Sequence, residues 1–123
     1  MSNQIAIIED DPALLQMYQL KFEAEGFTVK LAHNGVEGLA LLKDYAADMV
    51  LLDLMMPQMG GYEMLGKLRD TPHGKKTKVI ILTNIGEQEI PKGLEKLDIT
   101  GVIPKAYHTP AQVVEKVKTL LSS

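Results

Sequence analysis

Short apolar runs alternate with amphipathic segments along the whole chain. The apolar runs predict five β-strands, because short runs bounded by turn residues are typical of strands. Their ranges are Gln4 to Ile8, Thr28 to Ala32, Met49 to Leu52, Lys78 to Leu82 and Gly101 to Ile103. Runs such as MVLL and VIIL are apolar at every position, which indicates strands that are covered on both faces.

Between the strands, apolar residues recur at helical spacing. The clearest cases are Leu14, Leu15, Tyr18 and Phe22 in the first segment and Val113, Val114, Val117, Leu120 and Leu121 in the last. Asp11-Pro12 and Thr109-Pro110 predict two helix starts, because Asp and Thr cap helices and proline suits the first helical position. Gly26 predicts the end of the first helix. The five-fold βα alternation predicts a doubly wound α/β fold, a five-stranded parallel sheet with helices on both faces.

Length and composition favour a single domain spanning residues 1–123. Hydrophobic residues make up 46% and charged residues 24%, as in ordinary globular proteins. The chain has no apolar stretch of about 18 residues and no signal-like start, so we expect a cytoplasmic protein without a membrane segment. It has no Cys and a net charge of −3, which argue against a disulfide framework and against direct nucleic-acid binding.

Polar residues follow several predicted strands. Glu9 and Asp10 follow the first, Asp53 the third, Thr83 the fourth and Lys105 the fifth. Ligands of a doubly wound sheet bind beyond the carboxyl ends of its strands, where the strand order reverses. If the order is 2-1-3-4-5, strands one and three are neighbours, and the carboxylates converge at that point.

Such a cluster of carboxylates needs a positive partner. Charges about 5 Å apart repel by about 3 kcal/mol per pair at an effective dielectric near 20. Mg²⁺ suits the site because it prefers oxygen ligands and takes few carboxylates from a protein. We assign Asp10 as a direct ligand and Glu9 as a ligand through water, whereas Asp11 mainly caps the first helix.

Four segments at these intervals resemble the receiver (CheY-like) domain of two-component response regulators. They are IIEDD, LLDLMMPQMGG, ILTN and PK. The intervals are 43 residues from Asp10 to Asp53, 30 to Thr83 and 22 more to Lys105. The resemblance covers the whole chain and implies a flavodoxin-like fold.

The resemblance implies a phosphoacceptor signalling domain and not an enzyme, apart from catalysis of its own Mg²⁺-dependent phosphorylation and dephosphorylation. Asp53 would take a phosphoryl group from the phosphohistidine of a sensor histidine kinase or phosphotransfer protein. Mg²⁺ would be held by Asp10, Asp53 and the backbone carbonyl of Met55. The Thr83 hydroxyl and the Lys105 ammonium would neutralise the remaining phosphoryl oxygens.

The resemblance also implies a read-out through the face formed by the fourth helix, the fifth strand and the fifth helix, which would contact a downstream effector or output domain. The sequence departs from the family there. Val102 stands where an aromatic residue usually rotates, and Asn84 where a small residue follows the threonine. Ala106 replaces the usual proline after the lysine, and Pro104 precedes it instead.

The segment NIGEQEIPKGLEKL lies between the fourth and fifth predicted strands. Pro91 and Gly93 both disfavour a continuous helix from Glu87 to Leu97. We therefore expect the fourth helix to begin late or irregularly. Our hypothesis is that a change of order in this segment supplies the response that Val102 cannot give.

Three other functions can be compared with these residues, and the first two fit them poorly. A Mg²⁺ phosphohydrolase of the haloacid dehalogenase type needs a second Asp two residues after the nucleophile, but Met55 stands there. An FMN carrier needs a phosphate-binding loop after the first strand, where three acids stand instead. A receiver that no longer switches and acts as a docking adaptor is compatible with Val102 and Asn84.

Overall fold

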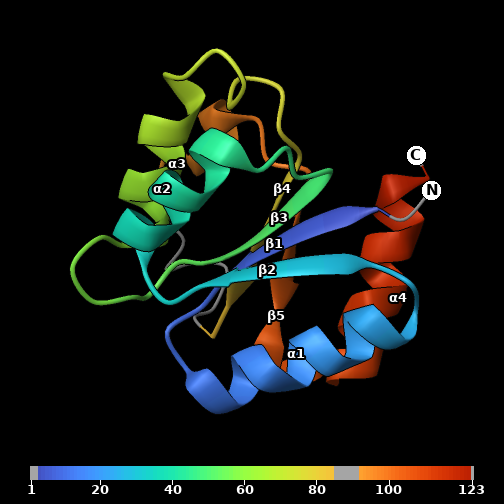
Figure 1. The fold of residues 1–123 in the computed structure, drawn as a ribbon. Helices are drawn as coiled ribbons and strands as arrows, with labels where there is room; N and C mark the ends of the chain where they lie inside the picture. Colours follow the sequence, from blue (N-terminus) through green and yellow to red (C-terminus); the bar gives the residue numbers. More distant parts are fainter. Residues whose placement is uncertain (1–2, 85–91, 123) are drawn as a thin grey trace.

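The structure is a computed structural model of the chain, and it describes residues 3–84 and 92–122. Five strands form one sheet in the order β2-β1-β3-β4-β5, and every pair is parallel (Figure 1). They are β1 (Gln4–Ile8), β2 (Thr28–Ala32), β3 (Met49–Asp53), β4 (Val79–Thr83) and β5 (Gly101–Pro104). The predicted fold class and strand order are confirmed.

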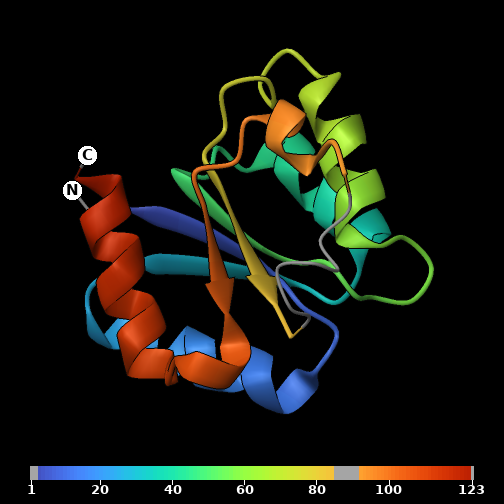
Figure 2. The ribbon, with the colours of Figure 1, turned by 180° about the vertical axis from the view of Figure 1, so that it is seen from behind.

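Within residues 3–84 and 92–122, four α-helices cover the sheet. They are α1 (Pro12–Ala24), α2 (Gly35–Asp44), α3 (Gly61–Arg69) and α4 (Pro110–Leu121). Helices α1 and α4 lie on one face, and α2 and α3 lie on the other (Figures 1 and 2). The last α-helix of the structure is therefore labelled α4, although it corresponds to the fifth helix expected from the sequence.

The predicted helix boundaries agree with the structure. The Asp11 side chain accepts hydrogen bonds from the backbone N–H groups of Ala13 and Leu14, at 3.0 and 3.4 Å. Thr109 caps α4 in the same way, through the N–H of Gln112 at 3.2 Å. Some strand boundaries differ by one residue: β3 ends at Asp53, β4 runs Val79–Thr83 and β5 ends at Pro104. These shifts bring the strands up to the candidate site residues.

The connection from β4 to β5 is the segment in which the sequence predicts a late or irregular fourth helix. Residues 85–91, including Pro91, lie outside the described part of the chain. Gly93 has a left-handed φ of +94°, and Leu94–Leu97 form a single 3-10 turn, η2. A second 3-10 turn, η3 (Lys105–Tyr107), follows β5. For residues 93–97 the expected irregularity is confirmed.

The core has two layers, one on each face of the sheet. Successive strand residues point to opposite faces, so Ile5 and Ile7 of β1 pack with α1 and α4, whereas Ala6 and Ile8 pack on the side of α2 and α3. All residues of β3 and β4 are buried. The central strands are thereby fixed between two packed layers, which holds their carboxyl ends in place.

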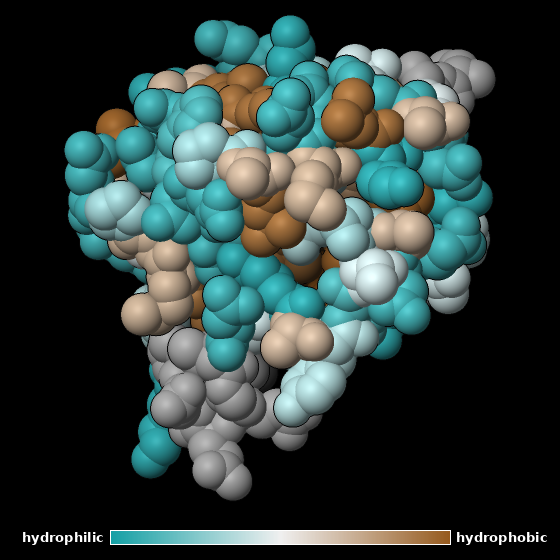
Figure 3. Space-filling model, turned by 90° about the horizontal axis from the view of Figure 1, so that it is seen from below, coloured by the Kyte–Doolittle hydropathy of each residue, from teal (hydrophilic) through white to brown (hydrophobic). Residues whose placement is uncertain are grey.

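The surface seen from below is mostly hydrophilic, with a group of apolar side chains near its centre (Figure 3). Helix α1, which lies lowest in Figure 1, contributes the exposed side chains of Met17 and Leu20. Every helix within residues 3–84 and 92–122 is too short or too polar to span a lipid bilayer.

Candidate functional site

The strand order brings the candidate carboxylates together. Strand β1 pairs directly with β3, with Ile8 opposite Leu52, so the residues that follow these partners lie side by side. Glu9, Asp10 and Asp53 each offer an oxygen atom, and these atoms lie within 4.8 Å of one another. The convergence expected at the switch point of the sheet is therefore present.

Asp53 is the last residue of β3, and only 3% of its surface is exposed. Its Oδ1 accepts a hydrogen bond from the Met55 N–H at 3.2 Å. Its Oδ2 lies 3.2 Å from the Lys105 Nζ. One carboxylate oxygen is thus held by the following loop and the other faces a cation.

Gly61 allows the loop after β3 to close tightly. A Cβ atom at this position would lie 2.3 Å from the Asp53 carbonyl oxygen, closer than any real contact. The Gly61 N–H also donates to the Leu54 carbonyl at 3.0 Å. The start of α3 therefore packs directly against the backbone of the candidate phosphoacceptor.

Lys105 reaches across the site from the end of β5. Its Nζ donates a hydrogen bond to Glu9 Oε1 as well as facing Asp53, and its side chain is only 9% exposed. Burial on its own would lower the pKa of Lys105, but the hydrogen bonds and charges of Glu9 and Asp53 raise it overall. Lys105 therefore offsets part of the negative charge of the carboxylates in this structure.

Glu9 is buried, with 1% of its surface exposed. Burial raises the pKa of its carboxyl group to about 7. The hydrogen bonds from Lys105 and from the Asp11 N–H, the latter at 3.1 Å, oppose that rise, whereas the nearby carboxyl groups of Asp53 and Asp10 add to it. Both Glu9 oxygens have hydrogen-bond donors, and Asp10 is the exposed member of the cluster.

Two further candidate residues border this cluster. Thr83 is the last residue of β4 and 1% exposed, one position beyond Leu82, the strand partner of Asp53. Met55 is 62% exposed, and its main-chain N–H donates to Asp53 Oδ1. Together with Lys105, these residues surround Asp53 from three strand ends.

The donor set fits a hard divalent cation. Three carboxylates supply oxygen ligands within one small volume, and Asp10 is open to solvent. Mg²⁺ prefers such a set of few carboxylates, because it keeps several water molecules. The buried Lys105 offsets only part of the negative charge.

Sequence reasoning missed two features of this site. The first is the ion pair between Lys105 and Glu9, because spacing along the chain indicates which edge a lysine reaches and not which carboxylate it binds. The second is the close approach at Gly61. The sequence feature that could have indicated this close approach is the Gly60-Gly61 pair after the third strand, but such a pair is also typical of an ordinary turn.

The positions that depart from the family pattern lie around this site. Val102 is half-buried on β5 opposite Ile81 and packs on the side of the sheet that carries α2 and α3. Asn84 and Ala106 are exposed. His33 pairs with Glu37, and His108 Nδ1 lies 2.9 Å from the Pro104 carbonyl oxygen.

Comparison with known proteins decides the family. The family model described as the response regulator receiver domain matches residues 5–118. The chain belongs to the response regulator receiver domain family. Receiver domains are signalling domains of two-component response regulators, which interact with histidine kinases and with effector output domains. As a family, receiver domains bind Mg²⁺ in the active site.

Relatives and solved structures agree with this assignment. The receiver domain is 37% identical to the transcriptional regulatory protein CpxR of Klebsiella pneumoniae over 120 residues, 97% of this chain and 49% of CpxR. It therefore spans about half the length of that relative. A CheY-like receiver domain protein from Methanospirillum hungatei JF-1 has a TM-score of 0.89 at 28% identity, covering 99% of this chain and 95% of that one.

A third comparison concerns the fold alone. The receiver domain of sensor histidine kinase PA1611 from Pseudomonas aeruginosa PAO1 has a TM-score of 0.88 at 19% identity, with both chains fully covered. That structure has a magnesium ion coordinated in the active site cleft.

Proposed function

We propose that this receiver domain accepts a phosphoryl group on Asp53 from the phosphohistidine of a sensor histidine kinase or a phosphotransfer protein. The observation that carries the proposal is the setting of Asp53. Its carboxylate is buried, lies within 4.8 Å of two other acids and has Lys105 at 3.2 Å. A carboxylate in a cluster of cation ligands, beside an ammonium group, is suited to receive a dianionic group.

In the proposed step, an Asp53 carboxylate oxygen forms a bond to phosphorus while the bond from phosphorus to the donor histidine nitrogen breaks. The histidine keeps the electron pair and takes a proton. The product is an acyl phosphate on Asp53 and a free histidine on the partner. Hydrolysis of the acyl phosphate returns the domain to its starting state, so the domain catalyses only its own modification and its reversal.

The acidic cluster would hold Mg²⁺ for this reaction. The proposed ligands are the carboxylates of Asp10 and Asp53 and the backbone carbonyl of Met55, with Glu9 acting through water. The two donors already bound to Glu9 support that indirect role. When bound, the ion neutralises charge on the phosphoryl oxygens. The metal site of the PA1611 receiver domain, which has the same fold, supports the assignment.

Lys105 and Thr83 would hold the other phosphoryl oxygens. Lys105 already points at Asp53, and its ammonium would move from a carboxylate pair to a carboxylate and phosphoryl pair without leaving the site. Thr83 would offer its hydroxyl from the end of β4. Both groups stabilise charge that grows on the oxygens during transfer.

The proposed output is a changed surface formed by residues 84–97, β5 and α4. Phosphorylation adds charge beside Thr83, at the start of that segment. CpxR is a transcriptional regulatory protein about twice as long as this chain, which supports an effector or output domain as the downstream partner. We place the domain in the cytoplasm, where the kinase domains of such systems would meet it.

The proposal is tested by phosphorylation with acetyl phosphate, followed by intact mass measurement. We expect one added phosphoryl group that needs Mg²⁺ and is lost in Asp53→Asn. Asp48→Asn, an exposed carboxylate at the opposite end of β3, is the matched control and should label normally.

Two outcomes would favour another function. Labelling that is absent in the unaltered protein, or that survives Asp53→Asn, would favour a docking adaptor. The observation that supports this second candidate is the half-buried Val102 in place of an aromatic residue. Sustained release of phosphate over many turnovers from a phosphomonoester would instead indicate a hydrolase.

A further inference from the structure

A groove runs between α2 and α3 and continues along the loop from Asp70 to Lys78. It consists of two adjoining hollows, with volumes of about 540 and 520 Å³. Both hollows are lined by the same central residues, Leu42, Lys43, Leu68, Pro72 and His73. The two hollows therefore form one continuous depression, large enough for several side chains of a partner.

The floor of the groove is apolar. Helix α2 contributes Val36, Leu39 and Leu42, and the loop before α3 contributes Met59. Val36 is 51% exposed, and Leu39 and Leu42 are only half-buried. These side chains lie next to one another, so the floor is a contiguous apolar surface and not one isolated exposed side chain.

The wall formed by the loop is held in place by the protein itself. The Arg69 guanidinium donates to the carbonyl oxygens of Gly74 and Thr77, at 2.5 and 2.7 Å. A Cβ atom on Gly74 would lie 2.0 Å from the Leu68 carbonyl oxygen, so only glycine permits this closure. The Thr71 hydroxyl donates to that same carbonyl and accepts from the Gly74 N–H. A preformed wall lowers the cost of ordering on binding.

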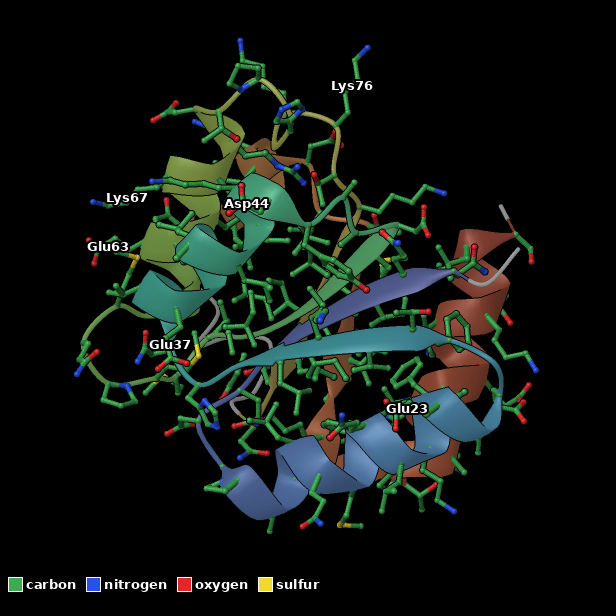
Figure 4. All side chains as sticks on the ribbon, in the orientation of Figure 1. Glu23, Glu37, Asp44, Glu63, Lys67 and Lys76 are labelled. Atoms are coloured by element: carbon green, nitrogen blue, oxygen red, sulfur yellow. The ribbon has the colours of Figure 1, made fainter. Side chains whose placement is uncertain are left out.

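The rim of the groove is basic. Lys43, Lys67 and Lys76 line the two hollows together with the carboxylate of Asp44, and the Lys67 ammonium also lies 3.8 Å from Glu63 on α3. Figure 4 shows Lys67 and Lys76 extending away from the core, from α3 and from the loop that follows it. The whole chain carries a net charge of −3, so this excess of lysines is local. An acidic partner is favoured here and not on the molecule at large.

We propose that this groove binds an acidic amphipathic helix of a partner protein. The apolar face of the helix would lie on Val36, Leu39 and Leu42, and carboxylates along its flanks would meet the three lysines. This is the helix-in-groove mode, in which apolar anchors give affinity and flanking charges give orientation. Nucleic acid fits less well, because the floor between the lysines is apolar.

The groove runs along α2, between the amino-terminal edge of the sheet and its carboxyl edge. Its lining includes Ala47 and Thr77, which precede the amino-terminal ends of β3 and β4. Asp53 and Thr83 lie at the carboxyl ends of the same strands. The other end of the groove is lined by Val36 and Met59, which follow the carboxyl ends of β2 and β3, so a helix docked along its whole length would approach the edge that carries Asp53.

The test uses the full chain labelled with ¹⁵N and a synthetic helical peptide of about four turns, with leucines on one face and glutamates on the flanks. A matched peptide carries lysine in place of every glutamate. We expect the acidic peptide to shift amide signals of α2, α3 and residues 70–78, and to bind more tightly than the basic one.

Variants then locate the site. Val36→Asp and Lys76→Glu should each lower the affinity for the acidic peptide by at least about threefold. Lys76→Glu should also raise the affinity for the basic peptide. Leu20→Asp on α1, also an exposed apolar position, is the control and should change neither affinity. Labelling by acetyl phosphate should be unchanged in all three variants, because none of these residues belongs to the Asp53 site, and this also shows that each variant is folded.

Three results would overturn the proposal. The first is the absence of amide shifts at about 1 mM acidic peptide. The second is equal binding of the two peptides, or shifts centred on α1 and α4. The third is self-association of the chain through the groove, which would assign the surface to a second copy.

Discussion

At the scale of single residues, Lys105 is the cation that offsets charge in the acidic cluster. Its ammonium is nearly buried between Glu9 and Asp53, whose side chains are 1% and 4% exposed. Removing one partner of a buried ion pair is costly, because the remaining charges lose both water and their counter-ion. The site would then depend more strongly on a bound cation.

Lys105→Met should therefore lower the free energy of unfolding by about 3 kcal/mol in the absence of Mg²⁺. Added Mg²⁺ should recover more stability in this variant than in the unaltered protein, because its binding energy adds to folding. Urea unfolding with and without Mg²⁺ measures both quantities.

Lys118→Met is the matched control for that measurement. Lys118 pairs with Glu25 at 2.9 Å, but 44% of its side chain is exposed. Surface ion pairs contribute little to stability, so we expect a much smaller loss than in Lys105→Met, with no dependence on Mg²⁺. Equal losses in the two variants would contradict the role given to Lys105.

At the scale of secondary-structure elements, the start of α3 fixes the backbone of Asp53. Gly61 lies against that backbone, whereas Gly66 lies one turn and a half further along the same helix with no atom within 4 Å of an added Cβ. The same substitution at the two positions thus separates close packing from helix propensity.

Gly61→Ala should destabilise the domain by about 2 kcal/mol or more, because a methyl group at 2.3 Å from the Asp53 carbonyl forces the loop apart. It should also slow labelling by acetyl phosphate. Gly66→Ala should stabilise the domain by about 0.5 to 1 kcal/mol, because alanine is the better helix former. Thermal unfolding measures the stability of the two variants, and the rate of labelling is measured beside it. Stability changes of the same sign in Gly61→Ala and Gly66→Ala would be inconsistent with this packing.

The elements differ in how far the sequence predicts them. The strands are predictable, because buried parallel strands are apolar at every position and turn residues bound them. Helix starts are predictable at Asp11 and Thr109, whose side chains cap through local hydrogen bonds. Contacts made by long side chains across the fold are not, because helical periodicity places Arg69 on a helix and does not say which carbonyl groups its guanidinium reaches.

The candidate site follows the same division. Strand order and the carboxyl-end rule bring Glu9, Asp10 and Asp53 together before any coordinates are known. The pairing of Lys105 with Glu9 and the groove beside α2 depend on packing between distant segments. Such features are properties of the folded chain, since neither has a local pattern in the sequence.

At the scale of the whole molecule, α3 holds the described end of the β4–β5 connection. The Tyr62 hydroxyl donates to the Lys92 carbonyl at 3.3 Å, and Arg69 Nε donates to the Leu97 carbonyl at 2.7 Å. Leu94–Leu97 form only one 3-10 turn between these two contacts. A segment with so little regular structure can respond to a change at Thr83 without disturbing the sheet.

Beryllofluoride, which imitates the phosphoryl group, should therefore change amide hydrogen exchange in residues 92–98 more than in α1 or α4. The physical reason is the low cost of reordering one short turn compared with a packed helix. Exchange measured with Asp53→Asn under the same conditions is the control. Equal protection with and without beryllofluoride would remove the hypothesis that this segment replaces the aromatic switch lost at Val102.

The central claim, that Asp53 is the phosphoacceptor, is tested most directly by mapping the modified residue. After labelling with acetyl phosphate and Mg²⁺, borohydride reduces an aspartyl phosphate to homoserine. The protein is then digested after its lysines, and fragment masses of the peptide that begins after Lys43 show which residue became homoserine. We predict homoserine at position 53 and unchanged aspartates at positions 44 and 48. Reduction at Asp44, Asp48 or Asp10, or none anywhere in the chain, would contradict the claim.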